Sequence, residues 1–203
     1  MIKVKVCGMR DPDNITAVAD LFPDYLGFIF YKDSPRYVGD EFALPENDVS
    51  TNVGVFVNES TGGILKRLQS INSHTAQLHG NETPLQCDDL KSRGITVIKV
   101  FSIDDGFDFK DVEPYKEVVD YFLFDTKGKL YGGNAKAFNW NKLKEYDQSV
   151  PFFLSGGLTP ENVRNLTDVD GMNLHALDLN SGVEDAPGMK NIEKIKSVMS
   201  CLK

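Results

Sequence analysis

Hydrophobic positions gather in eight short segments along this chain, separated by longer polar stretches. Several segments are continuous apolar runs rich in aromatic and β-branched residues, which is typical of parallel strands covered by helices. The eight segments are residues 2–7, 25–30, 52–57, 75–79, 95–101, 121–125, 151–155 and 173–179. Their ends recur every 22 to 30 residues, which is the spacing of repeated strand–helix units. The pattern predicts a single (β/α)8 TIM barrel.

Helix signals lie in the stretches between these strands. An N-cap residue followed by proline at the first helical position occurs at Asp11-Pro12, Thr83-Pro84 and Thr159-Pro160. Each pair predicts the start of a helix. Apolar residues at helical spacing follow Asp11 and continue to Ala19, and a similar stripe between Ile192 and Leu202 predicts the closing helix.

The length of 203 residues is near the lower limit for such a barrel, so residues 1–203 are predicted to form one domain with short helices and loops. No apolar run is long enough to cross a bilayer, and the N-terminus alternates apolar and charged residues without the pattern of a secretory signal. We therefore expect a cytoplasmic protein with no membrane partner.

A net charge of -8 argues against a nucleic-acid partner, because phosphate backbones are bound by clustered Lys and Arg. Any phosphate bound here is expected to be small and held locally. The three cysteines, Cys7, Cys87 and Cys201, are odd in number and lack paired spacing. Reduced thiols are therefore expected, and neither a disulfide framework nor a zinc site.

Two glycine-containing turns follow the last two strands. Gly156 and Gly157 come after the seventh strand, and residues 180–182 come after the eighth, where barrels commonly bind phosphate. Glycines let backbone amides approach an anion, and a short helix after the eighth strand would add its positive end. The alternative is two ordinary tight turns.

Two ionisable side chains end strands on opposite sides of the predicted barrel mouth. Cys7 ends the first strand; alone, a buried cysteine is more often an inert hydrophobe, but a helix beginning near Asp11 could lower its pKa enough to give a thiolate base. Asp125 ends the sixth strand, where it could cap a loop or, if semi-buried, keep a proton to donate. A base and an acid facing each other across a cavity suit proton transfer on a small molecule.

Two further residues are candidates for substrate binding. Arg36 lies on the long loop after the second strand, where it is either a solvated surface residue or a bidentate fork for a carboxylate. His79 ends the fourth strand and is as compatible with a structural role as with ligand binding. Because no histidine or acidic cluster lies near His79 in the sequence, a metal site is poorly supported.

Eight short motifs lie at or near the strand ends in chain order. They are residues 5–10 (KVCGMR), 27–30 (GFIF), 34–36 (SPR), 54–57 (GVFV), 77–80 (QLHG), 123–126 (LFDT), 155–158 (SGGL) and 178–184 (DLNSGVE). Together they resemble the phosphoribosylanthranilate isomerase family of tryptophan biosynthesis. The resemblance covers the whole chain. It implies a cofactor-free Amadori rearrangement of a phosphorylated small molecule, N-(5-phosphoribosyl)anthranilate. The sequence alone is compatible with a monomer or a homodimer.

The resemblance also implies roles for most of the candidates. Asp125 would be the general acid that opens the ribose ring, and Cys7 the general base that removes the C2 proton. The substrate-binding residues would be Arg36 on the anthranilate carboxylate, Gly156, Gly157 and Ser181 on the phosphate, and Asp178 and Asn180 on sugar hydroxyls or in loop ordering. His79 is a further candidate for substrate binding on its strand-end position, and the resemblance assigns it no role.

The chain departs from the family pattern in one loop and at one further position. Residues 132–140 read GGNAKAFNW where the family commonly has GGTGKTFDW, and Asn180 stands where many members have serine. The contribution of this loop to closure over substrate is therefore open.

Three rival interpretations remain. A ribulose-phosphate epimerase would need metal-ligand histidines at strand ends, and the aminoaldose isomerase of histidine biosynthesis has an aspartate where this chain has Cys7. The third rival is a noncatalytic barrel that binds a phosphorylated ligand.

Overall fold

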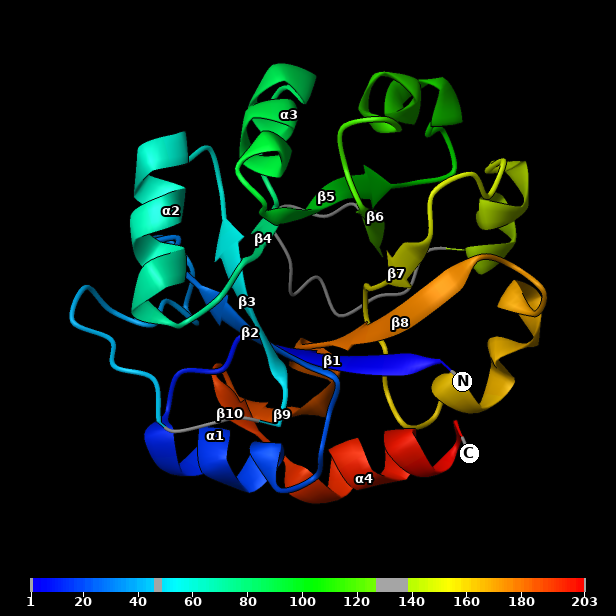
Figure 1. Cartoon of the computed structure of the whole chain (residues 1–203). Helices are drawn as coiled ribbons and strands as arrows, with labels where there is room; N and C mark the ends of the chain where they lie inside the picture. Colours follow the sequence, from blue (N-terminus) through cyan, green and yellow to red (C-terminus); the bar gives the residue numbers. More distant parts are fainter. Residues whose placement is uncertain (1, 46–48, 127–138, 203) are drawn as a thin grey trace.

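Eight parallel strands form a closed barrel in the computed structural model, which describes residues 2–45, 49–126 and 139–202. Each strand pairs with the next along the chain, and β8 closes on β1 (Figure 1). The strands are β1 Lys3–Cys7, β2 Tyr25–Ile29, β3 Thr51–Phe56, β4 Thr75–Leu78, β5 Thr96–Ile103, β6 Tyr121–Thr126, β7 Phe152–Leu154 and β8 Leu174–Leu179. The predicted (β/α)8 barrel is confirmed, with every strand end within two residues of its predicted position.

Helices surround the barrel on the outside (Figure 1). The α-helices are α1 Pro12–Ala19, α2 Thr61–Ser70, α3 Pro84–Ser92 and α4 Ile192–Ser200, and the 3-10 helices are η1 Phe109–Tyr115, η2 Trp140–Glu145, η3 Val163–Val169 and η4 Ser181–Val183. The caps predicted at Asp11 and Thr83 are confirmed, because both side chains accept a hydrogen bond from a backbone amide three residues later.

The helix predicted to begin at Thr159-Pro160 is wrong in type and start. The observed element is η3, a 3-10 helix that begins at Val163. Asn162 explains the delay: its side chain accepts from the Thr159 amide at 2.8 Å and donates to the Gly157 carbonyl at 2.8 Å. Residues 159–162 therefore form a turn tied back to the loop after β7.

An antiparallel hairpin that the sequence pattern did not predict follows η4. It consists of β9 Glu184–Ala186 and β10 Met189–Lys190. The side chain of Asn14 on α1 holds this hairpin by accepting from the Lys190 amide at 2.8 Å and donating to the Lys190 carbonyl at 2.9 Å. The hairpin therefore lies beside α1 and β1, as Figure 1 shows, and it carries the charged residues Glu184 and Lys190.

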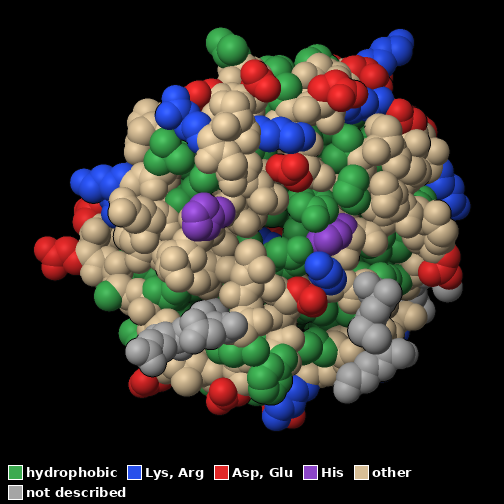
Figure 2. Space-filling view, in the orientation of Figure 1, with side chains coloured by type: hydrophobic (Ala, Val, Ile, Leu, Met, Phe, Trp, Pro, Cys, Tyr) green, Lys and Arg blue, Asp and Glu red, His purple; other side chains and the backbone are tan. Residues whose placement is uncertain are grey.

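Apolar side chains fill the barrel and the layer between strands and helices. The interior cluster comprises Tyr25, Val53, Ile98, Val100, Leu123, Phe153 and Ala176. Burial of this apolar surface provides the main stabilisation of the fold and leaves the polar strand ends at the mouth. None of the described helices has the length and apolar character needed to span a membrane. Basic and acidic side chains are interspersed on the face seen in Figure 2.

Candidate active site

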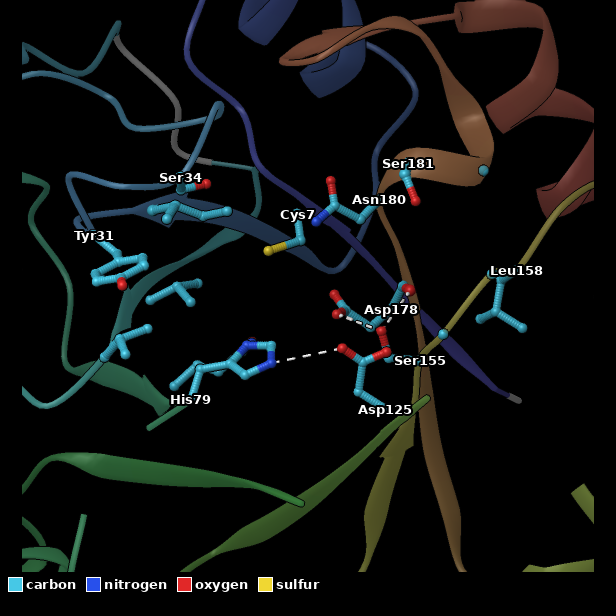
Figure 3. Close-up of a pocket in the computed structure, with 17 residues that line it drawn as sticks. Cys7, Tyr31, Ser34, His79, Asp125, Ser155, Leu158, Asp178, Asn180 and Ser181 are labelled. Carbon is cyan, nitrogen blue, oxygen red and sulfur yellow. Dashed lines mark hydrogen bonds and ion pairs between the residues drawn. The ribbon is translucent and has the colours of Figure 1, made fainter. Parts of the chain in front are cut away.

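A cleft opens at the carboxyl ends of the barrel strands, as expected for this fold (Figure 3). Its lining includes eight of the nine residues that the sequence indicates as site residues: Cys7, His79, Asp125, Gly156, Gly157, Asp178, Asn180 and Ser181. Arg36 is absent from the described lining and lies in an adjacent polar cluster. Residues from both ends of the chain therefore converge on one site.

Cys7 ends β1 with its sulfur directed into the cleft (Figure 3). The residue is only 2% exposed, and this burial raises the pKa of its thiol. The positive charges of Lys5 and Lys190 oppose that rise without cancelling it. The pKa of Cys7 is therefore raised, whereas the sequence predicted that it is lowered. The groups that favour the thiolate are the buried Lys5 and Lys190, and not the start of the helix near Asp11.

Asp125 lies across the cleft from Cys7, near the end of β6 (Figure 3). Its carboxylate is buried, with Oδ1 accepting from the Thr126 amide at 2.8 Å and Oδ2 lying 3.6 Å from Nε2 of His79. The ring of His79 also contacts Gln77, whose Nε2 is 3.3 Å from Nδ1. A carboxyl group and a thiol thus face one cavity, an arrangement that is suited to two proton transfers on one small molecule.

The two glycine turns pack against each other at one edge of the cleft. Gly156 and Gly157 have φ angles of 92° and 65°, in the left-handed region that favours glycine. A Cβ on Gly156 would collide with Thr126, and one on Gly182 would collide with the carbonyl oxygen of Leu158. Because side chains are excluded here, backbone amides can approach an anion closely.

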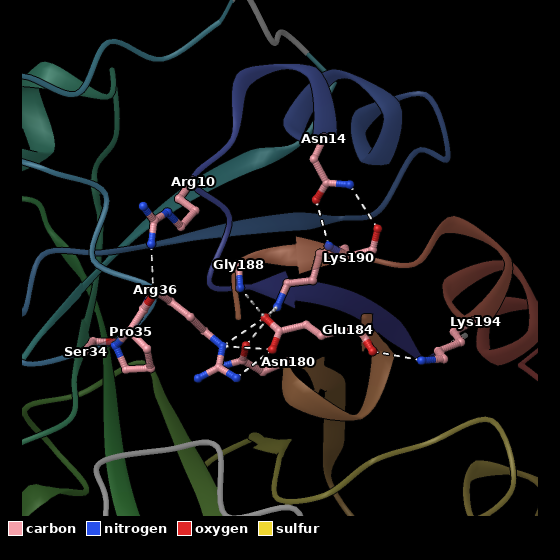
Figure 4. Close-up of polar contacts among 10 residues, drawn as sticks. All are labelled: Arg10, Asn14, Ser34, Pro35, Arg36, Asn180, Glu184, Gly188, Lys190 and Lys194. Atoms are coloured by element: carbon pink, nitrogen blue, oxygen red, sulfur yellow. Dashed lines mark hydrogen bonds and ion pairs between the residues drawn. The ribbon is translucent and has the colours of Figure 1, made fainter. Parts of the chain in front are cut away.

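The loop after β8 continues into a compact cluster of charges beside the cleft (Figure 4). Arg36 donates to Glu184 from Nε at 2.8 Å and from Nη2 at 2.6 Å, and Nζ of Lys190 donates to Glu184 at 2.6 Å. Lys190 also donates to Oδ1 of Asn180 at 2.8 Å. The cluster therefore connects the loop that carries Arg36 to the loop proposed to bind phosphate.

The pKa values of Glu184 and Lys190 are both below their usual values, for different reasons. Burial alone would raise the pKa of Glu184, but hydrogen bonds from Arg36 and the charge of Lys190 hold that pKa below its usual value. For Lys190, burial outweighs the attraction of Glu184 and lowers the pKa to about 8. Glu184 is thus held as a carboxylate at neutral pH.

The sequence interpretation missed three charged residues beside the cleft whose side chains are at most 5% exposed: Lys5, Glu184 and Lys190. Lys5 had a detectable signal, since side chains two apart on a strand share a face and Lys5 is two residues before Cys7. Glu184 lies within the quoted motif 178–184, but its partner Arg36 is 148 residues away. Among the residues with described positions, no group of three or more His, Cys, Asp or Glu gathers as metal ligands do.

Comparison with known proteins gives the family. The family model described as N-(5'phosphoribosyl)anthranilate (PRA) isomerase matches residues 4–200. The chain belongs to the PRA isomerase family. The relative from Phocaeicola vulgatus, named N-(5'-phosphoribosyl)anthranilate isomerase, is 46% identical over 98% of this chain and 97% of its own length. The relative of the same name from Parabacteroides distasonis is 42% identical over 96% of this chain and 90% of its own length.

Solved structures of PRA isomerases have the same fold. The Thermotoga maritima phosphoribosyl anthranilate isomerase matches with a TM-score of 0.86 and 34% identity, covering 99% of this chain and 98% of the other. A PRA isomerase in complex with reduced 1-(o-carboxyphenylamino)-1-deoxyribulose 5-phosphate matches with a TM-score of 0.84 and 32% identity, covering 98% of this chain and 97% of the other. In the loop that departs from the family pattern, residues 132–138, which include Ala135, lie outside the described residues.

Proposed function

We propose that this chain converts N-(5-phosphoribosyl)anthranilate to 1-(o-carboxyphenylamino)-1-deoxyribulose 5-phosphate in tryptophan biosynthesis, with Asp125 as general acid and Cys7 as general base. The observation that carries this proposal is the convergence of Cys7 and Asp125, from β1 and β6, on one cleft beside the two glycine turns. The relatives named as PRA isomerases and the solved complex with a reduced product analogue support the choice of substrate.

The first step opens the sugar ring. Asp125 donates its proton to the ribose ring oxygen as the bond from that oxygen to C1 breaks. The electron pair of the anthranilate nitrogen then forms a double bond to C1, which gives an iminium cation, while the ring oxygen becomes a hydroxyl group. The nearby ring of His79, 3.6 Å from the Asp125 carboxylate, lies where it can contact the opened sugar.

The second step removes the proton at C2. The iminium cation acidifies this C–H bond, so a thiolate is an adequate base without further electrophilic assistance. Cys7 takes the proton, the bonding electrons form a C1–C2 double bond, and the nitrogen becomes neutral. The resulting enolamine becomes the ketone when C1 gains a proton and the C2 hydroxyl loses one. Cys7 then releases its proton and Asp125 regains one through solvent, so the overall reaction is an isomerisation of the substrate.

Both ends of the substrate need to be fixed for these transfers. We assign the phosphate to the backbone amides of Gly156, Gly157 and Ser181, and the anthranilate carboxylate to Arg36. Asp178 and Asn180 would order the turn or contact the sugar hydroxyls. Held at two ends, the sugar carbons lie between acid and base, which reduces the entropy cost of reaching the transition state.

Assembly and location complete the proposal. A solved structure of monomers generated from the dimeric Thermotoga maritima PRA isomerase is 30% identical to this chain with a TM-score of 0.78. We propose a monomer or a homodimer. We place the chain in the cytoplasm, where phosphorylated biosynthetic intermediates are made and used.

The test of the function uses the purified chain in buffer with a metal chelator. We expect it to convert N-(5-phosphoribosyl)anthranilate to the ketose product, identified by mass and chromatography, and to restore growth of a tryptophan auxotroph lacking this isomerase. A chain in which both Cys7 and Asp125 are replaced by alanine is the negative control. Binding of the substrate without conversion would favour the noncatalytic barrel instead.

A further inference from the structure

Lys5 is a fully buried cation directly below the cleft. It lies on β1 two residues before Cys7, so both side chains project from the same face of the strand. Burying an ammonium group is costly unless it is paired. Because Lys5 is 0% exposed inside the barrel, its ammonium group needs partners that replace its lost hydration.

The first partner of Lys5 is Asp178, which stands opposite it in the register of β1 and β8. Nζ of Lys5 donates to Oδ1 of Asp178 at 2.7 Å, and the second carboxylate oxygen accepts from the hydroxyl of Ser155 at 3.2 Å. Asp178 is only 5% exposed. Both of its oxygens are thus engaged, so the carboxylate holds the ammonium group of Lys5 in a fixed position.

The second neighbour of Lys5 is Cys7, and the charge of Lys5 lowers the pKa of the Cys7 thiol against the effect of burial. Gly27 on β2 provides the space for both side chains, because it pairs with Cys7 in the sheet. A Cβ at Gly27 would lie 2.8 Å from Sγ of Cys7 and 3.1 Å from Nζ of Lys5. Sulfur and ammonium therefore share the space that this glycine leaves free.

We propose that Lys5 is a positioning residue whose ammonium group, anchored by Asp178, stabilises the thiolate of Cys7 as the base of the reaction. The inference rests on the proposed function, in which that thiolate removes the C2 proton of the sugar. When the thiolate forms, the thiol proton leaves to solvent. When it accepts the C2 proton, the thiol is restored. Lys5 keeps its protons throughout and acts only through its charge.

The charges around Cys7 predict opposite effects for two substitutions. Burial raises the pKa of the thiol, Lys5 is the strongest opposing charge, Asp178 adds to the rise, and Lys190 opposes it. Asp125 and His79 face the sulfur from across the cleft. Removing the charge of Lys5 should therefore raise the pKa of Cys7 further, because burial and Asp178 both raise it. Removing the charge of Asp178 should lower this pKa, because Lys5 then favours the thiolate without that opposing charge.

The test is a pH titration of Cys7 in the full chain, followed by the 13Cβ NMR resonance of labelled cysteine and assigned by its loss in Cys7→Ser. In Lys5→Met we expect the titration midpoint to rise by about 1 to 3 pH units, the range for loss of a neighbouring opposite charge. In Asp178→Asn we expect it to fall. Lys3→Met is the matched control, because it removes the same charge from an exposed position at the other end of β1, and its midpoint should equal that of the wild type.

An unchanged midpoint in folded Lys5→Met, or an equal shift in Lys3→Met, overturns the inference. If Lys5→Met does not fold, Asp178→Asn decides: a lower midpoint supports the inference, and an equal or higher one overturns it. The pH profile of kcat should follow the same shifts.

If the wild type does not convert the substrate while the midpoints shift as expected, the proposed function fails and the stabilisation of the thiolate stands. If conversion requires Cys7 but Lys5→Met leaves the midpoint unchanged, the inference alone fails.

Discussion

Arg36 and Glu184 form a two-pronged ion pair beside the cleft, with Nε of Arg36 at 2.8 Å and Nη2 at 2.6 Å from the two carboxylate oxygens. The family resemblance implies that Arg36 binds a substrate carboxylate, and in the structure Nε and Nη2 of its guanidinium group are already hydrogen-bonded to Glu184. Among the described residues, Nη1 donates no hydrogen bond. Glu184 therefore fixes the orientation of the guanidinium group, and we expect Nη1 to be the atom that contacts a ligand.

Replacing Arg36 by methionine should weaken substrate binding more than catalysis. We expect KM for N-(5-phosphoribosyl)anthranilate to rise roughly 10-fold to 100-fold, the value of a hydrogen bond to a charged group. Steady-state kinetics should also show a much smaller effect on an analogue that lacks the carboxylate. Arg93→Met, which removes an exposed arginine on the outer surface, is the control. An unchanged KM in Arg36→Met would remove Arg36 from the site.

Glu184→Gln should change the acid stability of the protein. Because the folded state lowers the pKa of Glu184 from its usual 4.5, the ionised carboxylate stabilises the fold above pH 4.5, and this contribution is lost as pH falls through the lowered pKa. At pH 7 the variant should therefore be less stable by about 3 kcal/mol, the scale for breaking a buried ion pair. Urea unfolding between pH 7 and pH 3 should show this difference shrinking in acid. A constant difference would contradict the assigned charge state.

Gly156→Ala should impair phosphate binding. Its φ of 92° and the collision of a Cβ with Thr126 require the turn to move, which displaces the backbone amides from the anion. We expect inhibition by ribose 5-phosphate to weaken at least about 10-fold, at the scale of one lost charge-assisted hydrogen bond. Gly94→Ala is the matched control, since Gly94 has a φ of 78° with open space around it. Equal inhibition of Gly156→Ala and wild type would refute the phosphate assignment.

The barrel and the meeting of Cys7 with Asp125 could be predicted because both follow from strand periodicity. Once eight strands close into a barrel, residues at their carboxyl ends must share one mouth, whatever their separation along the chain. That inference is independent of loop conformation. Strand periodicity, together with the strand-end motifs that carry the family resemblance, therefore placed eight of the nine candidate residues around the cleft that the structure contains.

The rest depended on contacts that periodicity does not encode. The hairpin that carries Glu184 and Lys190 is only three and two residues per strand, too short for an alternation pattern to be visible. The direction of the pKa change at Cys7 depends on the balance between burial and neighbouring charges, which only coordinates provide. The delayed start of η3 follows from side-chain contacts of Asn162, which compete locally with helix formation.

The most direct test of the account is kcat for N-(5-phosphoribosyl)anthranilate in Cys7→Ser and Asp125→Asn, measured at saturating substrate beside the wild type. Each variant removes one proton-transfer group while keeping the size of the side chain nearly constant. The account predicts that each lowers kcat by about 100-fold or more, the scale of lost acid or base catalysis. Near-normal rates in folded samples of both variants would contradict it.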